Sequence, residues 1–349
     1  MAADAHPAPE APYAELTPHR ILDRLEDLGL FGDGRLLQLN SYENRVVQAG
    51  LEDGGFVVLK FYRPGRWTEA QILEEHSFAA ELAAAEVPVI APLVLQPVDG
   101  ARLRDEAPPL EHLGRPATLA RRGALRWAVS PRAGGRTPEL DDPEVLLRIG
   151  HCLGRMHAVG RRQPFAHRPR LDLARLGEQA RATVLASPHL PLDLAGRWRD
   201  TVDALLDRVR ERFAAQPGLR WLRAHGDCHP GNLLWTEAGG PHFVDLDDCG
   251  TAPAVQDLWM LLPGDEAGSR QALAALLEGY EAFCDFDPAE RRLIEPLRSL
   301  RLIHHSAWLA QRWADPAFPA AFPWFDSPSY WAQQTVQLQE QIERLDEGR

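Results

Sequence analysis

Polar side chains of the types needed for phosphoryl transfer lie between residues 225 and 245. Asp227 and Asn232 are five residues apart, and Asp245 follows thirteen residues later, directly after the apolar pair Phe243-Val244. Phosphoryl transfer needs a carboxylate that orients and deprotonates the attacking hydroxyl, an amide oxygen on Mg²⁺ and a second carboxylate that joins the metal to the phosphates. Asp227, Asn232 and Asp245 supply these three groups in that order.

A transition-metal site formed by His225, Asp227 and His229 is the alternative, because alternating His and Asp side chains can chelate a metal. This alternative explains neither Asn232 nor Asp245, so phosphoryl transfer is favoured. We expect His225 to be a structural hydrogen-bonding residue behind the loop rather than a base. A redox role for Cys228 or Cys249 stays open, although most loop cysteines are inert.

Lysine is almost absent from this chain. Lys60 is the one lysine among 38 cationic side chains, and it ends the apolar run of residues 56–59. Arginine presents a wide planar fork, whereas lysine is a compact point charge on a slim stem. A position that keeps lysine in such a composition indicates a chemical site, and phosphate binding is the commonest such role. Chance survival of one lysine on a strand is the competing interpretation.

Composition narrows the class of protein. The 349 residues are 45% hydrophobic and 25% charged, as in a soluble globular protein, and the formal net charge is −12. This charge argues against nucleic-acid binding, which needs a basic face. Residues 1–12 do not resemble a secretion signal, and no apolar run is long enough to cross a membrane. With four widely spaced cysteines, we expect a cytoplasmic protein with reduced thiols and no membrane partner.

The first third of the chain has the pattern of a small sheet with one strong helix. We expect a disordered tail over residues 1–14 and a helix over residues 16–30. Alternating apolar residues, interrupted by a polar turn at 40–44 and Gly54-Gly55, predict strands. Thr68 is expected to cap a helix that runs to residue 85. The predicted strands are 37–39, 45–48, 56–62, 89–95 and 125–129.

The rest of the chain is mostly helical in pattern. Apolar residues at three- and four-residue spacing predict helices, with short strands and polar loops only over residues 221–246. An interruption of this kind is a common place for function. The expected domains are an N-lobe over 15–130 and a C-lobe over 131–349, with a hinge at 130–136. The predicted helices are 143–159, 195–215, 271–283, 288–313 and 330–345.

These motifs together resemble a known family. The pattern His-Gly-Asp-x-His-x-x-Asn at 225–232, followed by Val244-Asp245, is similar to the aminoglycoside phosphotransferase and choline kinase branch of the protein-kinase-like fold. Within it, further blocks resemble a group of bacterial serine/threonine protein kinases of the stress response, and the likeness extends over roughly residues 16 to 345. These blocks are residues 39–46, 58–64, 72–76, 153–157, 253–260 and 312–318.

The resemblance implies an α+β, two-lobed protein-kinase-like fold, with a small antiparallel-sheet N-lobe and a mostly helical C-lobe. It implies ATP in the cleft near the hinge, with Lys60 on the α- and β-phosphates and Ser41 on a phosphate. It also implies that Asp227 accepts the proton and that Asn232 and Asp245 bind Mg²⁺. A carboxylate on the helix after Thr68 would orient Lys60; Glu75 is preferred and Glu74 is the alternative, because neighbours on a helix point about 100° apart.

The family also implies an acceptor and a cellular role. It implies phosphorylation of serine or threonine on proteins, including the chain itself, with a role in survival of envelope or oxidative stress and in restraint of stress-induced cell death. We also expect a monomer. The chain has no G-x-G-x-x-G loop, and only residues 246–256 lie between Asp245 and Asp257. This short segment keeps open a small-molecule kinase that acts on a sugar, amino alcohol or aminoglycoside hydroxyl. A pseudokinase-like binding module is disfavoured, since Lys60 and all three polar residues are present.

Overall fold

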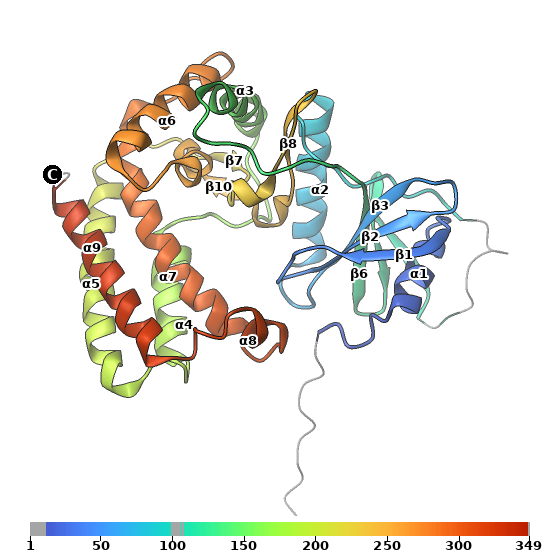
Figure 1. Ribbon diagram of the computed structural model, residues 1–349, viewed down its shortest axis with the longest axis horizontal. Helices are drawn as coiled ribbons and strands as arrows, with labels where there is room; N and C mark the ends of the chain where they lie inside the picture. Colours follow the sequence, from blue (N-terminus) through green and yellow to red (C-terminus); the bar gives the residue numbers. More distant parts are fainter. Residues whose placement is uncertain (1–11, 99–105, 107, 348–349) are drawn as a thin grey trace, which may run out of the picture. The chain divides into compact units, whose positions relative to one another are not determined.

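The computed structural model of this chain describes residues 12–98, 106 and 108–347. They divide into two compact units, of which the first contains residues up to Ala80 and Ile90–Ala133, and the second contains Glu81–Val89 and Gly134 onward. The predicted tail, residues 1–14, lies outside the described residues as far as residue 11; residues 12–15 form a turn. The predicted fold class is confirmed: an antiparallel sheet and a mostly helical part, as Figure 1 shows.

The first unit is built on a six-stranded antiparallel sheet in the order β1-β2-β3-β6-β5-β4. Side chains alternate between its faces, as the period of a strand requires. Leu59 and Phe61 of the central strand pack with Ile21 and Leu25 of α1 on one face. The strands are β1 (Gly32–Gln38), β2 (Arg45–Leu51), β3 (Phe56–Phe61), β4 (Leu110–Gly114), β5 (Ala117–Arg122) and β6 (Leu125–Pro131), and α1 is Pro18–Glu26.

The other face of the sheet packs against α2 (Glu69–Ala84). Ile72 of the helix is fully buried there, next to Tyr62 and Ala128 of the sheet. Lys60 is on β3, two residues before Tyr62, which directly follows the strand; it lies opposite Val46 on one side and Ala128 on the other. The alternation that buries Leu59 against α1 therefore directs Lys60 to the face that carries α2.

Three details of this sheet differ from the sequence prediction. The first strand, expected at 37–39, is longer and begins earlier, at Gly32. The strand expected at 89–95 is wrong: Val89 makes an isolated bridge with Phe243, and the residues after it have no regular structure. The segment is apolar because it is packed, and Leu93 and Leu95 donate backbone hydrogen bonds to residues of β6 and β5. Conversely, β4 and β5 were not predicted, because arginine and glutamate pairs interrupt their apolar pattern.

The second unit is largely helical. Its α-helices are α3 (Pro143–Gly160), α4 (Ala180–Ala186), α5 (Leu192–Ala214), α6 (Glu266–Tyr280), α7 (Ile294–Arg312), α8 (Ala317–Ala321) and α9 (Pro328–Glu347), with a π-helix at Ala174–Gln179. The single helix expected at 288–313 begins instead as a 3-10 helix, Pro288–Leu293, before α7. A tertiary contact fixes this turn, since Glu290 accepts a hydrogen bond from the Val255 amide at 2.9 Å.

Close helix packing in this unit depends on glycine. A Cβ atom at Gly150 of α3 would lie 2.1 Å from the carbonyl oxygen of Leu276 in α6, and one at Gly279 would lie 2.0 Å from that of Leu147. No side chain fits at either position without moving a backbone. These glycines therefore allow α3 and α6 to approach closely.

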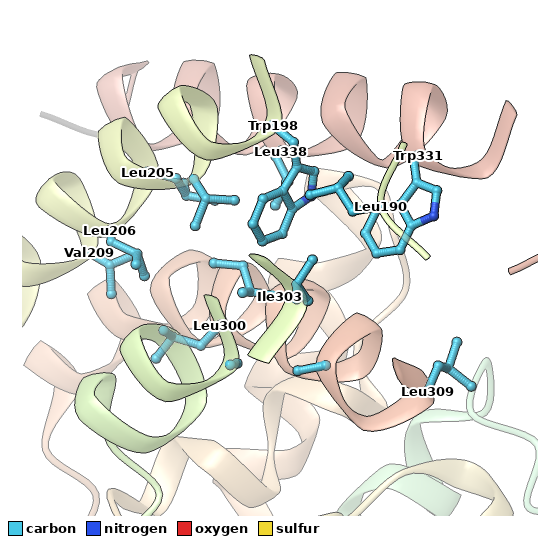
Figure 2. Packing of buried hydrophobic residues seen from close by; sticks show 14 of the residues in the cluster. Leu190, Trp198, Leu205, Leu206, Val209, Leu300, Ile303, Leu309, Trp331 and Leu338 are labelled. Carbon is cyan, nitrogen blue, oxygen red and sulfur yellow. The ribbon is translucent and has the colours of Figure 1, made fainter. Parts of the chain in front are cut away.

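A second core lies among α4, α5, α7 and α9 (Figure 2). Trp198 and Trp331 meet edge to face there, with ring centroids 6.2 Å apart. The indole of Trp198 donates to Gln334 at 2.6 Å, which satisfies its buried N–H. Leu300 and Ile303 of α7 are buried in this core, and α7 also contributes a residue to the site described below.

Short strands interrupt the helices. β7 (Leu222–Ala224) pairs with β10 (Gly250–Ala252), and β8 (Leu233–Thr236) pairs with β9 (Gly240–Phe243). β7, β8 and β9 lie within residues 221–246, as the sequence predicted, whereas β10 lies beyond that range. Short 3-10 helices occur at Pro230–Asn232, Leu246–Asp248, Ala254–Asp257 and Trp259–Leu261. Across the described ranges, no helix combines the length and the apolar character needed to cross a membrane.

Candidate active site

Lys60 and Glu75 form an ion pair in the first unit. The Lys60 Nζ lies 3.2 Å from Glu75 Oε1, and both side chains are largely removed from solvent. Glu75 is buried, whereas Glu74 is half-buried, so of the two adjacent carboxylates Glu75 is the one that pairs with Lys60. A charge-assisted contact of this kind holds an ammonium in one place. Its use for nucleotide phosphates stays a prediction.

A buried polar chain supports the ion pair. The Lys60 ammonium lies 5.1 Å from the ring centroid of Tyr62, and the Tyr62 hydroxyl is 2.7 Å from His76 Nε2. His76 Nδ1 in turn lies 2.9 Å from the hydroxyl of Thr118 on β5. Tyr62 and His76 thus join β3, α2 and β5 through hydrogen bonds, which fixes the strand that carries Lys60 against the helix that carries Glu75.

Ser41 is in the turn between β1 and β2, where it is half-buried. Arg63 clamps this turn, since its guanidinium donates to the carbonyls of Glu43 at 2.9 Å and Tyr42 at 3.0 Å. The Arg63 amide also donates to Asn44 Oδ1 at 3.2 Å. A clamped turn presents backbone and hydroxyl groups in a fixed arrangement, which is what a phosphate-binding turn needs. The contact between Ser41 and a phosphate stays a prediction.

In the second unit, Asp257 anchors the loop that carries Asp227. The Asp257 carboxylate accepts hydrogen bonds from the backbone N–H groups of His225 at 2.7 Å and Gly226 at 2.8 Å. It also lies 2.9 Å from His157 Nε2, and both side chains are fully buried. Burial of Asp257 favours the neutral form, but His157, His225 and the Gly226 amide outweigh it and lower the pKa of this carboxyl.

This anchor was not identified from the sequence. Asp257 and His157 lie in the blocks 253–260 and 153–157, and the sequence assigned neither of them a role. His157 and Asp257 are 100 residues apart, so local sequence patterns cannot predict their contact. The sequence indicated only that each of these two blocks contains an ionisable residue among apolar ones.

Hydrogen bonds join the segments that carry Asp227, Asn232 and Asp245. Asn232 Nδ2 donates to the carbonyl of Asp227 at 2.9 Å, and the Asn232 carbonyl accepts from the Val244 amide at 3.0 Å. His225 Nε2 bonds to the Val244 carbonyl at 2.9 Å, from a fully buried ring. His225 thus has the structural role that its sequence context predicted.

The Asp245 backbone has an unusual conformation. Its φ of 58° and ψ of 63° lie in the left-handed region, which non-glycine residues rarely adopt. Strain of this kind is commonly found at functional sites. Because Asn232 uses its NH₂ group for Asp227, its Oδ1 is the atom suited to a cation. Oxygen atoms of Asn232 and Asp245 are ligands of the kind that Mg²⁺ prefers, so these two residues could hold it together.

Two cationic or polar groups contact the Asp227 carboxylate. Arg301 Nη1 of α7 lies 2.5 Å from Oδ1, and His229 Nε2 lies 3.5 Å from Oδ2. His229 Nδ1 accepts from the Gly231 amide at 3.0 Å, so the neutral ring carries its proton on Nε2, toward Asp227. Burial opposes ionisation of Asp227, but His229 and Arg301 outweigh it and lower the pKa of this carboxyl. Arg301 was not predicted, because it is 74 residues away in sequence.

The transition-metal alternative fits this geometry poorly. His225 Nε2 is engaged by the Val244 carbonyl and His229 Nδ1 by the Gly231 amide. Within residues 12–98, 106 and 108–347, no three His, Cys, Asp or Glu side chains gather closely enough to hold a metal ion. The oxygen ligands Asn232 and Asp245 are the better candidates, and for them a role in metal binding stays a prediction.

Cys228 and Cys249 are both buried and reduced. Burial, with smaller effects of Asp257 and Asp227, raises the pKa of the Cys228 thiol well above its ordinary value. The thiolate is the reactive form of cysteine. The surroundings of Cys228 therefore favour an inert side chain over a redox role.

Comparison with known proteins identifies related chains. A model of the phosphotransferase enzyme family matches residues 35–294. Stress response kinase A of Escherichia coli (strain K12) is 44% identical over 339 residues, covering 96% of this chain and 95% of that protein. Serine/threonine protein kinase RdoA of Salmonella typhimurium (strain LT2) is 43% identical over 335 residues, with the same coverage of 96% and 95%.

Solved structures show the same fold. An amicoumacin kinase in complex with AMP-PNP, Ca²⁺ and Ami aligns with a TM-score of 0.67 at 21% identity, over 93% of both chains. A microcompartment-associated aminopropanol kinase aligns with a TM-score of 0.63 at 17% identity, over 94% of this chain and 98% of that one. At such identities the likeness concerns the fold alone.

Proposed function

This chain belongs to the phosphotransferase enzyme family, in its stress response kinase A group, and is an ATP-dependent phosphotransferase; we propose that it is a Mg²⁺-dependent serine/threonine protein kinase. Acceptor proteins would include the chain itself. The proposal follows the curated relatives, one of which is named a serine/threonine protein kinase and matches over 96% of this chain.

Each predicted residue has a defined role in this proposal. Asp227 orients the acceptor hydroxyl and takes its proton, while Asn232 and Asp245 hold the metal ion. Bound there, Mg²⁺ would offset the negative charge of the phosphates. Lys60, positioned by Glu75, would hold the α- and β-phosphates, and Ser41 would contact a phosphate from its turn.

One observation supports this assignment most directly. A single fully buried carboxylate, Asp257, fixes the backbone of residues 225 and 226, the two residues that directly precede the predicted base. Asn232 then bonds to the carbonyl of that base. Catalysis by positioning requires a loop that is rigid before the substrate arrives, and a binding module would have no need of such an anchor.

The test is an assay with labelled ATP and three classes of acceptor: the protein itself, a generic protein acceptor and a panel of small hydroxyl compounds. Mg²⁺-dependent transfer to serine or threonine, absent in Asp227→Asn, is the expected result. Rapid transfer to a small alcohol, with no protein-bound phosphate, would instead establish the second candidate, a small-molecule kinase.

A specific observation favours that second candidate. Residues 246–256, after Asp245, are taken up by 3-10 turns and the three-residue strand β10, so they offer little surface for a peptide. The panel should therefore include a sugar, an amino alcohol and an aminoglycoside, because these classes differ in charge and size.

We also propose a cellular role in survival of envelope or oxidative stress, with restraint of stress-induced cell death, by a monomer acting in the cytoplasm where ATP is supplied. Survival of a deletion strain under either stress, complemented with the wild-type protein or with Asp227→Asn, tests this role. Equal protection by both proteins would show that phosphoryl transfer is not what protects the cell.

A further inference from the structure

The predicted base of this enzyme is in contact with an arginine from another part of the fold. Arg301 lies in the middle of α7, and its Nη1 is 2.5 Å from Asp227 Oδ1. The Asp227 side chain is only 24% exposed, whereas that of Arg301 is 44% exposed. The buried partner is thus fixed, and the arginine can leave the contact by rotating into solvent.

Arg301 is next to an aromatic surface of the same unit. His305 lies one turn further along α7, and its ring stacks on Trp324, with centroids 6.4 Å apart and planes 20° apart. Trp324 is 44% exposed, an unusual exposure for so large an apolar side chain. A ligand that reaches Asp227 along this surface would meet the guanidinium first.

The contact constrains which acceptors can be used. An acceptor hydroxyl must approach the Asp227 carboxylate, so it must share that carboxylate with Arg301 or displace it. A cationic group beside the hydroxyl would be repelled by the guanidinium, while a carboxylate would give it a replacement partner with bidentate geometry. At hydrogen-bonding distance from the guanidinium, a carboxylate is attracted and a cation is repelled. The difference between these two interactions is enough to change the rate by roughly tenfold or more.

We propose that Arg301 is a specificity-determining residue that selects acceptors with a carboxylate next to the phosphorylated hydroxyl. This inference rests on the proposed function for the kind of acceptor: in a protein kinase, the preferred site is a serine or threonine flanked by Asp or Glu. The charge selection itself belongs to Arg301 and would apply equally to small acceptors.

Three serine peptides of the same length, flanked by Glu, Gln or Lys, test the proposal. Wild type is expected to have a kcat/KM at least tenfold higher for the Glu peptide than for the Lys peptide, mostly through KM. Arg301→Gln should bring this ratio to within about threefold, and Arg301→Glu should invert it. Arg301→Lys, which keeps the charge but loses the bidentate fork, should keep only part of the ratio. Peptide binding, measured by fluorescence anisotropy, gives a second readout that does not depend on turnover.

Arg344→Gln is the matched control, because the Arg344 side chain is similarly exposed, at 45%, and pairs with Glu295 at 3.9 Å rather than with Asp227. It should leave the peptide ratio unchanged. A ratio near one in wild type, or an unchanged ratio in Arg301→Gln, would overturn the proposal. If no peptide is phosphorylated but small alcohols are, the proposed protein-kinase function fails; glycerate compared with ethanolamine as acceptors then tests Arg301 by the same ratio.

Discussion

The carboxylate of Asp257 accepts a hydrogen bond of 2.7 Å from the backbone amide of His225, and both residues are fully buried. This contact joins the segment after β10 to the start of the loop that carries Asp227. An ionised carboxylate accepts several hydrogen bonds at once, whereas an amide side chain accepts with only one of its two ends. The loop geometry therefore depends on an aspartate at this position.

We predict that Asp257→Asn destabilises the protein by roughly 2–4 kcal/mol and lowers the phosphoryl-transfer rate about 10²-fold or more. The reason is that one of the bonds to His157, His225 or Gly226 must be lost in a buried site. Urea unfolding and the labelled-ATP assay measure the two effects. Asp200→Asn, whose side chain is 70% exposed on α5, is the control and should change neither.

The same residue predicts a pH dependence of stability. Because the pKa of Asp257 is lowered in the folded protein, its charge stabilises the fold fully above the ordinary value of 3.8, and this contribution is lost as pH falls through the folded pKa. The free energy of unfolding of wild type should therefore fall more steeply between about pH 5 and pH 2 than that of Asp257→Asn. Parallel curves for the two proteins would show that Asp257 carries no such linkage.

Substitution of Asp227 tests the phosphoryl-transfer step separately from folding and ATP binding. Asp227→Asn should fold normally and still bind ATP, because the amide nearly preserves the shape of the side chain. Loss of a general base typically lowers the rate by about 10² to 10⁴. A variant that keeps near-wild-type turnover in the labelled-ATP assay would rule out Asp227 as the proton acceptor.

Asp245 gives a prediction about metal. Asp245→Ala should weaken Mg²⁺-dependent nucleotide binding while leaving metal-free binding largely intact, since a metal ligand is removed. Asp245→Asn tolerates the left-handed backbone as well as aspartate does, so it separates loss of charge from loss of backbone conformation. Nucleotide affinity is followed across a Mg²⁺ titration, and identical curves for wild type and Asp245→Ala would contradict the assignment. Tight stoichiometric zinc in the purified protein would point instead to His225 and His229.

The sequence predicted those strands and helices whose local pattern of apolar residues is clear. Apolar alternation located β2, β3 and β6, and helical spacing located α2, α3, α5 and α9 to within a few residues. An ambiguous pattern led to the wrong strand at 89–95. These residues are apolar because they are packed, not because they pair in a sheet.

Among the residues of the candidate site, too, the sequence could predict only those that lie close together in the chain. Asp227, Asn232 and Asp245 lie within 19 residues and could be recognised as a set. Asp257 and Arg301 could not, because their roles arise only when the fold brings them to residues 225–227 from 31 and 74 positions away. Glu75 was an intermediate case: helix geometry limited the choice to two carboxylates, and tertiary packing buried one of them.

The last prediction concerns Lys60, whose ammonium is held 3.2 Å from Glu75 between strands of the first unit. We predict that Lys60→Arg loses most phosphoryl-transfer activity although the charge is conserved. An arginine fork is wider than an ammonium and favours bidentate contacts, so two of its three nitrogens would pair with Glu75. The positive charge would then be displaced from the position at which the Lys60 ammonium would meet the phosphates. A positioning error of about 1 Å can lower a rate about 10²-fold.

The measurement is the activity of Lys60→Arg relative to Lys60→Ala and to wild type, with thermal unfolding to check that each variant folds. Arg35→Lys, the reverse exchange on an exposed part of β1, is the control and should have full activity. If the shape of the cation matters, Lys60→Arg will be about as inactive as Lys60→Ala. Near-complete activity in Lys60→Arg would mean that Lys60 supplies only a generic positive charge, and that a single lysine among 38 cationic residues is an accident of composition.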